Sequence, residues 1–428
     1  MNVEVIVISD DLTGAADTGI KFQSVFNPIY LLSHTGLDKL DIESRPRAIA
    51  IFTNSRGSST QDTKSIFRQT TRALQTLKHQ WIYKKIDSCM RGAVGLECSI
   101  LVSSLKKKAC FVAPAYPLQD RTTVNDIHLV GGKPVDRTEI GRDPICPVPE
   151  SSLTKLISAN HRYKVGHVGI RFVEGGIEAL VSEVTRLVTI GNRLIGFDAK
   201  TEDHLKKIAE IALSRFSNVL LAGSAGLASA IVEKLGRNIS KDQTPRQYSP
   251  SRGYSNLLIV SGSTSNILLK QIMVLQKTFP CEIINLEPEI LLDLCTQSLK
   301  DKIVDELSCI LINRCLVLQI KPSTHTKDRW FAQSLLRGLA ELVRCLIERS
   351  LPSAVFLSGG DTAAAILDRL NPYPIRLEKE IVDCVVATTA LQGPLSGRMI
   401  VLKAGALGSL RSLVELYRYC YEGGDHDR

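Results

Sequence analysis

Short apolar segments alternate with amphipathic ones along the first half of the chain. The apolar runs at residues 3–9, 48–53, 81–86 and 110–113 are rich in β-branched side chains and are predicted to be buried strands. The polar stretch at 60–78 has the composition of an amphipathic helix. Strands that alternate with helices in this way predict a parallel sheet with helices on its faces.

The alternation is interrupted between residues 121 and 149. This stretch is rich in Thr, Asp, Gly, Arg and Pro and shows little periodicity. A connection of this length without secondary structure is typical of a functional or a disordered loop. The α/β alternation resumes near Lys164 and continues to a helix predicted over 225–235.

A polar stretch at 236–256, which contains Pro245 and Pro250, separates the two halves of the chain. It predicts a domain at 1–238, a linker at 239–256 and a second domain at 257–428. The second half is again α/β, with a long amphipathic helix at 328–350. Its predicted strands are 257–260, 315–320, 354–357, 382–387 and 399–402. We therefore expect an α/β fold of two domains, each with a largely parallel sheet flanked by helices, and an active site in the cleft between them.

Composition narrows the class of protein. With 428 residues the chain is too long for one ordinary core, and its net charge of +9 is scattered rather than clustered. The longest basic run, 106–108, contains no aromatic residue, so it indicates a solvated face rather than nucleic-acid binding. Eleven cysteines without a Cys-x-x-Cys pair indicate reduced thiols in a cytoplasmic protein, without a metal-ligand spacing. No segment has the features of a signal peptide or a membrane span, so a soluble protein is expected.

Three polar clusters of the first half follow predicted strands. They are Asp10-Asp11, Ser55-Arg56 and the run of residues 84–88. Because ligands of open parallel sheets bind at the carboxyl ends of strands, we expect these clusters to surround one crevice. Arg can grip a carboxylate with two hydrogen bonds, Lys adds a point charge, and Asp accepts hydrogen bonds from hydroxyls or removes a proton. Such a set suits a polyhydroxy acid.

Each of these residues also has a purely structural alternative. Asp11 or Thr13 can cap the helix that follows the first strand, and Asp87 or Ser88 can cap the next helix. Arg56 can be an ordinary surface residue. His128 in the central stretch is interpreted as structural rather than catalytic.

The second half repeats a strand, a loop of small residues and a helix three times. The loops are residues 261–265, 358–362 and 403–409, and the last begins with Lys403. Small residues let backbone N–H groups approach phosphate oxygens, and a helix N-terminus adds a positive dipole. Three such loops favour a nucleotide over simple turns. Neither a Walker-type P-loop nor a Gly-x-Gly-x-x-Gly dinucleotide motif is present.

Two specific motifs resemble those of the four-carbon acid sugar kinases. Residues 8–19 resemble the opening motif of that family, and residues 84–92 resemble its second motif. The stretch from Arg121 to Pro144 is similar to the family's central excursion, and the three small-residue loops are similar to its nucleotide motifs. The resemblance covers nearly the whole chain in the expected order.

The resemblance implies an ATP-dependent kinase whose N-terminal domain holds the acid and whose C-terminal domain holds ATP with Mg²⁺. We expect Asp10 to act as the base or to orient the hydroxyl. No dedicated protein cage for the metal is visible in the sequence, as is normal for Mg²⁺ held mainly by nucleotide. The implied substrate contacts are Asp10, Arg56, Lys85, Ile86, Asp87 and Ser88. The implied ATP contacts are Ser261, Gly359, Gly360, Asp361, Lys403, Ala404, Gly405 and Ala406.

The second motif is similar to the D-threonate kinase branch, so the expected product is a 4-phosphate formed at the terminal hydroxyl. Cys89-Met90 stands where Thr-Leu is usual, and Ala406-Leu407 where Gly-Phe is usual; these differences bear on substrate identity. D-Erythronate, L-threonate, 3-oxo-tetronate and aldonates of other lengths stay open as substrates. A non-catalytic nucleotide and acid sensor and a nucleic-acid-modifying enzyme are the alternatives from other classes. The expected partners are the acid and ATP, without nucleic acid or membrane, and a homodimer is left open.

Overall fold

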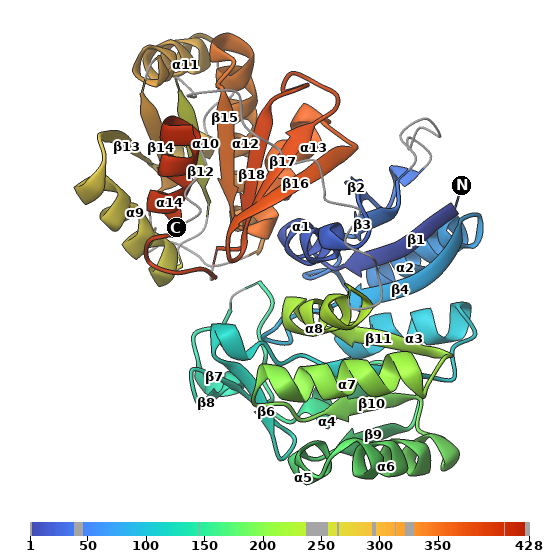
Figure 1. Ribbon diagram of the computed structural model, residues 1–428. Coiled ribbons are helices and arrows are strands. Elements are labelled where there is room, and N and C mark those ends of the chain that lie inside the picture. Colours follow the sequence, from blue (N-terminus) through green and yellow to red (C-terminus); the bar gives the residue numbers. More distant parts are fainter. Residues whose placement is uncertain are drawn as a thin grey trace. The chain divides into compact units, whose positions relative to one another are not determined.

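A computed structural model describes residues 2–37, 46–143, 145–236, 256–262, 265–292, 297–312, 314–321, 329–405 and 407–423. The chain divides into two compact units, Met1–Pro245 and Arg246–Arg428 (Figure 1). The linker expected at 239–256 lies outside the described residues, apart from Asn256, so the domain limits stay a prediction.

The first unit is built on a sheet in which every strand pairing is parallel. Its strands are β1 (Asn2–Ser9), β2 (Ile29–Ser33), β3 (Ala48–Phe52), β4 (Lys78–Lys85), β5 (Ala109–Ala113), β9 (Val165–Val168), β10 (Leu194–Phe197) and β11 (Val219–Gly223). Their order across the sheet is β2-β3-β1-β4-β11-β5-β10-β9. The strands read as nearly continuous apolar runs because both faces of a parallel sheet are covered by helices.

Two groups of neighbouring helices flank this sheet (Figure 1). One group comprises α1 (Leu12–Lys21), α5 (Ile170–Glu174), α6 (Ile177–Thr189), α7 (Glu202–Ser214) and α8 (Ala225–Gly236), and the other α2 (Thr60–Gln75), α3 (Val94–Ser104) and α4 (Leu153–Ser158). The sequence sets the start of α2, because the Ser59 side chain accepts a hydrogen bond from the Asp62 amide. Phe67 of α2 is then fully buried.

The central excursion, expected to be a loop, contains a small antiparallel sheet instead. Its strands are β6 (Arg121–Val124), β7 (Ile127–Val130) and β8 (Lys133–Pro134). Asn125 and Asp126 join the first two strands, and both have positive φ, as the type I′ turn of a tight hairpin requires. The strands are too short and too polar for their alternation to stand out in the sequence.

The second unit has a mixed sheet of the order β13-β14-β12-β15-β18-β17-β16. Its strands are β12 (Leu257–Ser261), β13 (Cys281–Leu286), β14 (Cys315–Ile320), β15 (Ala354–Ser358), β16 (Ile375–Val382), β17 (Val385–Ala390) and β18 (Met399–Lys403). The first five strands in that order pair in parallel, and β17 pairs antiparallel with both neighbours. The expectation of one strand at 382–387 is wrong, because a tight turn at Asp383 and Cys384 divides that run between β16 and β17. The expected class, an α/β fold with a largely parallel sheet, is confirmed.

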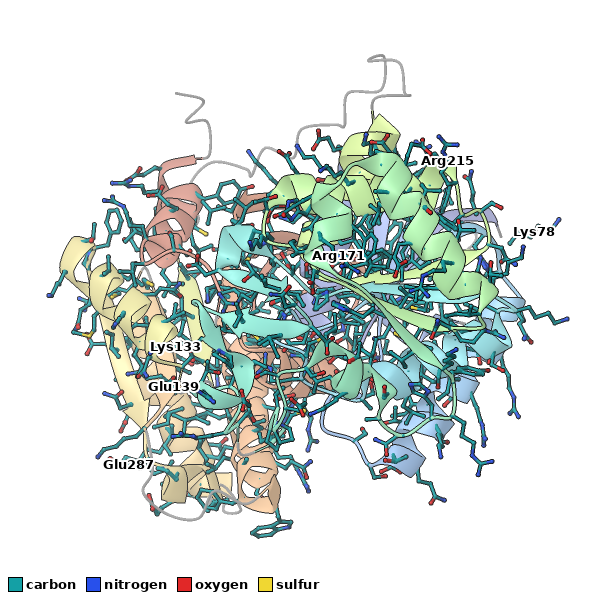
Figure 2. The ribbon with its side chains drawn as sticks, turned by 90° about the horizontal axis from the view of Figure 1, so that it is seen from below. Lys78, Lys133, Glu139, Arg171, Arg215 and Glu287 are labelled. Carbon is teal, nitrogen blue, oxygen red and sulfur yellow. The ribbon has the colours of Figure 1, made fainter. Side chains whose placement is uncertain are left out.

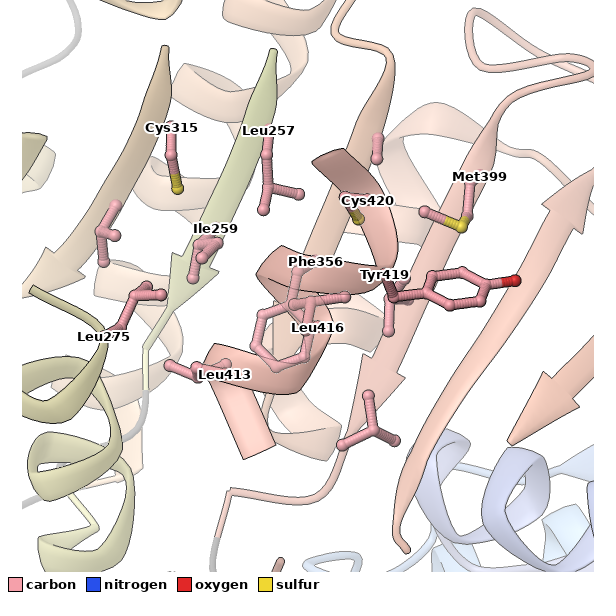
Figure 3. Packing of buried hydrophobic residues seen from close by; sticks show 14 of the residues in the cluster. Leu257, Ile259, Leu275, Cys315, Phe356, Met399, Leu413, Leu416, Tyr419 and Cys420 are labelled. Atoms are coloured by element: carbon pink, nitrogen blue, oxygen red, sulfur yellow. The ribbon is translucent and has the colours of Figure 1, made fainter. Parts of the chain in front are cut away.

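Helices pack over this second sheet and close its core. They are α9 (Asn266–Thr278), α10 (Pro288–Leu292), α11 (Gln297–Leu311), α12 (Arg329–Ser350), α13 (Gly360–Leu370) and α14 (Ser412–Arg418), followed by a π-helical turn at Tyr419–Gly423. Figure 3 shows Phe356 of β15 beside Leu413 and Leu416 of α14, in the cluster that also contains Leu275 of α9. All four side chains are buried.

Cationic side chains are spread over separate elements. Figure 2 shows Lys78, Lys133, Arg171 and Arg215 on different parts of the first unit, and all four are exposed. This distribution agrees with the scattered charge of the sequence. Among the described residues, no helix combines the length and the apolar character that a membrane span needs.

We expect Phe356→Ala to lower the free energy of unfolding of the second unit by about 3–5 kcal/mol, because it leaves a cavity under α14. Met273 of α9 is 55% exposed, so Met273→Ala should change it by no more than about 0.5 kcal/mol. Urea unfolding followed by circular dichroism compares the two variants. Equal effects of both would contradict this view of the core.

Candidate active site

The strand register of the first unit brings the three polar clusters to one edge of the sheet. Ser9, the last residue of β1, pairs with Phe52 of β3 on one side and with Lys85 of β4 on the other. The segments that follow these strands therefore leave the sheet at neighbouring positions. The convergence expected for Asp10, Arg56 and Asp87 is what the structure shows.

Arg56 lies among three carboxylates. Its Nε donates to Oδ2 of Asp10 at 2.7 Å and its Nη2 to Oδ1 of Asp10 at 3.0 Å. The same Nη2 donates to Oδ1 of Asp11 at 2.7 Å and lies 3.9 Å from Oδ1 of Asp87. Burial alone would lower the pKa of Arg56, but the three carboxylates raise it well above its ordinary value. The Arg56 guanidinium is therefore permanently charged. Its side chain is only 16% exposed, so Arg56 is not an ordinary surface residue.

Asp87 is held by a second arginine. Arg91 Nε donates to Oδ2 of Asp87 at 2.9 Å and Arg91 Nη2 to Oδ1 at 3.1 Å, and Arg91 Nη1 lies 3.5 Å from Oδ2 of Asp143 in the central excursion. Burial would raise the pKa of Asp87, but Arg91 and Arg56 outweigh it and hold that pKa far below its usual range. Asp87 is thus an ionised carboxylate with fixed geometry.

Asp11 stands at the N-cap position of α1, yet its side chain makes no capping hydrogen bond. Its carboxylate accepts instead from Arg56 and, at 2.8 Å, from the Thr13 hydroxyl. Burial raises the pKa of Asp11, but Arg56, Lys85 and the Thr13 bond together bring it below the ordinary value. The capping alternative for Asp11 is therefore not what the structure shows.

The two lysines that end β4 have different environments. Successive side chains of a strand point to opposite faces. The Lys84 ammonium is buried against Glu97 of α3, with Nζ 2.7 Å from Oε2. The Lys85 ammonium donates to the Ile86 carbonyl at 2.8 Å, and no described carboxylate forms an ion pair with it. Lys85 is the cation of the cluster that an anionic ligand can engage.

The remaining residues of the second motif shape the backbone. Ile86 is fully buried, and its amide donates to Gly223 of β11. The Ser88 carbonyl accepts from Nε2 of His128 at 2.7 Å, and Nδ1 of the same ring accepts from the Thr123 hydroxyl at 3.0 Å. Burial lowers the pKa of His128 to about 4, so the ring is neutral near pH 7. His128 of the central excursion thus fixes the backbone of the second motif at Ser88.

Gly92 closes the motif directly beside Asp10. Its φ is +92°, and a Cβ at this position would lie 3.2 Å from Oδ2 of Asp10. The Gly92 amide donates to Sγ of Cys146, and that thiol lies 3.2 Å from the Arg56 carbonyl. A side chain at Gly92 would strain the backbone and disturb the carboxylate.

In the second unit, the three small-residue loops also leave the sheet side by side. Ser261 at the end of β12 pairs with Ser358 of β15, which pairs with Lys403 of β18. Gly359 has a φ of +97° and precedes α13, which begins at Gly360 and carries Asp361 in its first turn. Backbone N–H groups at such a helix start favour phosphate oxygens. Ala406 lies outside the described residues.

Lys403 is the buried cation of these loops. Its Nζ donates to the Ala404 carbonyl at 2.8 Å and lies 3.5 Å from the Gly405 carbonyl. Burial lowers the pKa of Lys403 to about 8. No described carboxylate forms an ion pair with this ammonium, so a bound anion would stabilise its charged form.

Comparisons with known proteins agree with this division. A model of a sugar-binding N-terminal domain matches residues 5–231, and a model of a nucleotide-binding C-terminal domain matches residues 258–413. The D-threonate kinase of Salmonella typhimurium is 26% identical, over 98% of this chain and 99% of its own. The D-erythronate kinase of Heliobacterium modesticaldum is 25% identical, over 95% and 94%.

The chain belongs to the four-carbon acid sugar kinase family. The family and the kinase class expected from the motifs are thus confirmed. A solved structure of a Salmonella typhimurium LT2 protein has a TM-score of 0.79 to this chain at 19% identity, and the match covers 97% of this chain and 99% of the other. At that identity the likeness supports the fold.

Several residues that contact the cluster around Arg56 and Lys84 were not identified from the sequence. Glu97 and Cys146 come from segments with no visible relation to the motifs, and Arg91 and Asp143 lie inside matched stretches but had no assigned role. One signal was available. Two consecutive lysines at a strand end must face opposite ways, so one of them needs a buried partner.

We expect Asp87→Asn to lower the free energy of unfolding by about 3 kcal/mol at pH 7, because it removes the carboxylate that holds the buried Arg91 guanidinium with two hydrogen bonds. The folded pKa of Asp87 is below its unfolded value of about 3.9, so ionised Asp87 stabilises the fold above about pH 4. The gap between wild type and variant should shrink as the pH falls below 4. Urea unfolding from pH 7 to pH 3 tests this, and a gap that stays constant would contradict it.

Proposed function

We propose that this protein transfers the γ-phosphoryl group of ATP to the terminal hydroxyl of a four-carbon sugar acid, with D-threonate as the substrate and the 4-phosphate as the product. One observation carries the proposal. In the unit that matches a sugar-binding domain, fixed carboxylates lie beside a cation, Lys85, that forms no ion pair among the described residues. A small molecule with one carboxylate and several hydroxyls complements this set.

Lys85 is the group that we assign to the substrate carboxylate. The two arginines of the cluster are already engaged by Asp10 and Asp87, so their guanidinium groups shape the site more than they attract another anion. The carboxylates of Asp10 and Asp87 then accept hydrogen bonds from hydroxyls. We assign close backbone contacts to Ile86 and Ser88, whose segment is held by Gly223 and His128.

Asp10 is the residue that we assign to the reacting hydroxyl. A carboxylate offers about four acceptor positions, and Arg56 occupies two of those of Asp10. The remaining positions can receive the proton of the attacking hydroxyl or orient that hydroxyl. Arg56 fixes the plane of the carboxylate, which restricts the directions from which a hydroxyl can approach.

The nucleotide loops are assigned to ATP. We place Ser261, Gly359, Gly360 and Asp361 around the phosphates, together with Lys403, Ala404, Gly405 and Ala406. The backbone N–H groups would cradle the phosphate oxygens and Lys403 would place its charge among them. Negative charge near Lys403 would raise the pKa that burial lowers, and so keep the ammonium protonated.

We propose that Mg²⁺ is held mainly by the phosphates of the nucleotide. The described residues contain no group of three or more His, Cys, Asp or Glu side chains that could hold a metal ion. Mg²⁺ is commonly bound by phosphates and one or two carboxylates, and Asp361, in the first turn of α13, is a carboxylate within the loop at 358–362. The ion would supply neutralisation of phosphate charge.

The test is an assay of ADP release with ATP and Mg²⁺ across D-threonate, L-threonate, D-erythronate, 3-oxo-tetronate and five- and six-carbon aldonates. We expect D-threonate to give the highest kcat/KM. A higher kcat/KM for another four-carbon acid would identify that acid as the substrate and leave the proposed reaction unchanged. Ligands that raise the melting temperature without any ADP release would overturn the kinase proposal in favour of a sensor.

We expect Asp10→Asn to lower kcat by a factor of about 10² to 10⁴, because the amide cannot take up a proton, while the affinity for ATP stays unchanged. Glu4 offers a matched control, since it pairs with Arg47 at 2.6 Å near the opposite end of β1. Glu4→Gln should leave kcat within a factor of two. Steady-state kinetics and nucleotide titration measure both quantities, and an active Asp10→Asn enzyme would refute the role.

We expect binding of a non-hydrolysable ATP analogue at pH 9 to take up close to one proton. Lys403 with a pKa of about 8 is mostly neutral at pH 9, and the triphosphate favours its charged form. At pH 7 the lysine is already mostly charged, so uptake should be small. Calorimetry in buffers of different ionisation enthalpy measures the proton count.

A lysine on the surface of the same unit serves as the control for this titration. Lys321 is paired with Glu287 at 2.7 Å and is half exposed, so Lys321→Met should leave the uptake unchanged. Binding without proton uptake at pH 9 in the wild type would show that Lys403 does not contact the phosphates of the nucleotide.

A further inference from the structure

A second ion pair lies next to the acid site and is sealed from solvent. Lys84 Nζ is 2.7 Å from Oε2 of Glu97, and their side chains are 0% and 1% exposed. Lys84 belongs to β4 and Glu97 to α3, so the pair joins a strand end to a helix. Neither side chain can touch a bound acid, and no role in the reaction proposed above uses them.

Glu97 also holds the end of β3. Its Oε1 accepts from the Ser55 hydroxyl at 2.8 Å. Ser55 immediately precedes Arg56, and its amide donates to the Asp10 carbonyl at 3.0 Å. The Thr53 hydroxyl lies 2.9 Å from that of Ser55 and donates to the Ser9 carbonyl at 3.0 Å. One carboxylate of α3 therefore reaches the segments that carry Arg56 and Asp10.

Lys84 connects this network to the end of β4. Its Nζ donates to the carbonyl of Lys85 at 2.9 Å, so the ammonium bonds the backbone of the residue that we assign to the substrate carboxylate. The three segments that carry Asp10, Arg56 and Lys85 are thus linked through Lys84, Glu97 and Ser55. Lys84 bonds the backbone of Lys85 itself, and Glu97 bonds the side chain of Ser55, the residue that precedes Arg56.

Stability alone does not account for this pair. The desolvation of two buried charges offsets much of their attraction, and apolar side chains of similar volume often stabilise a core equally well. The Phe67 ring, whose centroid is 5.3 Å from Lys84 Nζ, recovers part of that cost. What apolar residues cannot supply is the fixed direction of the bonds to Ser55 and Lys85.

We propose that Lys84 and Glu97 are positioning residues for the acid site, which lock the ends of β1, β3 and β4 so that Asp10, Arg56 and Lys85 keep their mutual geometry. The inference rests on the proposed function for its link to catalysis. It extends that function, because it assigns substrate affinity to residues that the substrate does not contact.

The test compares three variants of the full-length protein. Lys84→Met combined with Glu97→Gln removes both charges at nearly constant length, and Ser55→Ala removes one link with little change in volume. Thr70→Val is the matched control, because the Thr70 hydroxyl is buried in the same unit but bonds only the Ile66 carbonyl within α2. Melting temperatures identify the range in which each variant is folded.

We expect the double variant to raise the KM for the acid at least tenfold and Ser55→Ala to raise it several-fold, while the KM for ATP stays within a factor of two. Thr70→Val should leave both constants unchanged. A purely structural role would lower the melting temperature without moving the KM for the acid in the folded range. That outcome would overturn the inference.

A second readout does not depend on turnover. The Arg56 Nε–H, which bonds Asp10 in the wild type, should exchange with water at least tenfold faster in the double variant, as measured by NMR; loss of the signal in Arg56→Lys assigns it. If the wild type phosphorylates no acid, the proposed function fails, but this exchange still decides the inference. Should the double variant not fold, Ser55→Ala decides it by the same two readouts, and unchanged values would refute it.

Discussion

The bidentate bond between Arg56 and Asp10 is the interaction on which the polar cluster at the sheet edge depends. Asp10, Asp11 and Asp87 come from two strand ends and would repel one another in a buried space. Arg56, from a third strand end, lies within 4 Å of all three and converts the repulsion into attraction. The edge of the sheet can therefore hold several carboxylates close together, and we propose these as the acceptors for the hydroxyls of the substrate.

The two units use charge in opposite ways. In the first unit, charges are dense and mutually compensated, and Lys85 forms no ion pair among the described residues. In the second unit the described loops are nearly uncharged, with small residues and a single buried lysine, Lys403. This difference matches the ligands that we propose. A small acid brings one charge and needs a preformed site, whereas a nucleotide brings several charges and needs donors and space.

The four strands predicted for the first half correspond to β1, β3, β4 and β5, because parallel strands buried on both faces appear as continuous apolar runs. The strand β2 was not predicted, and β9, β10 and β11 were expected only as a resumed α/β alternation. The sequence was sufficient for the convergence at one sheet edge, because polar residues that follow such runs must meet there. It did not reveal the small sheet of the excursion, whose strands have at most four residues, nor the β16–β17 hairpin, whose turn interrupts an apolar run at Cys384. The partners of the cluster, above all Glu97 and Asp143, depend on tertiary contacts between segments more than 10 residues apart. Residue spacing carries no information on such pairs.

The proposed reaction transfers the phosphoryl group to the terminal hydroxyl of a four-carbon acid. A proton-coupled ³¹P NMR spectrum of the product formed from D-threonate and ATP tests it directly. Phosphate on the terminal carbon couples to two methylene protons, so its resonance should be a triplet that collapses on decoupling. A doublet would place the phosphate on a secondary carbon, and a spectrum without any new phosphomonoester resonance would show that no acid is phosphorylated. Either result would contradict the account.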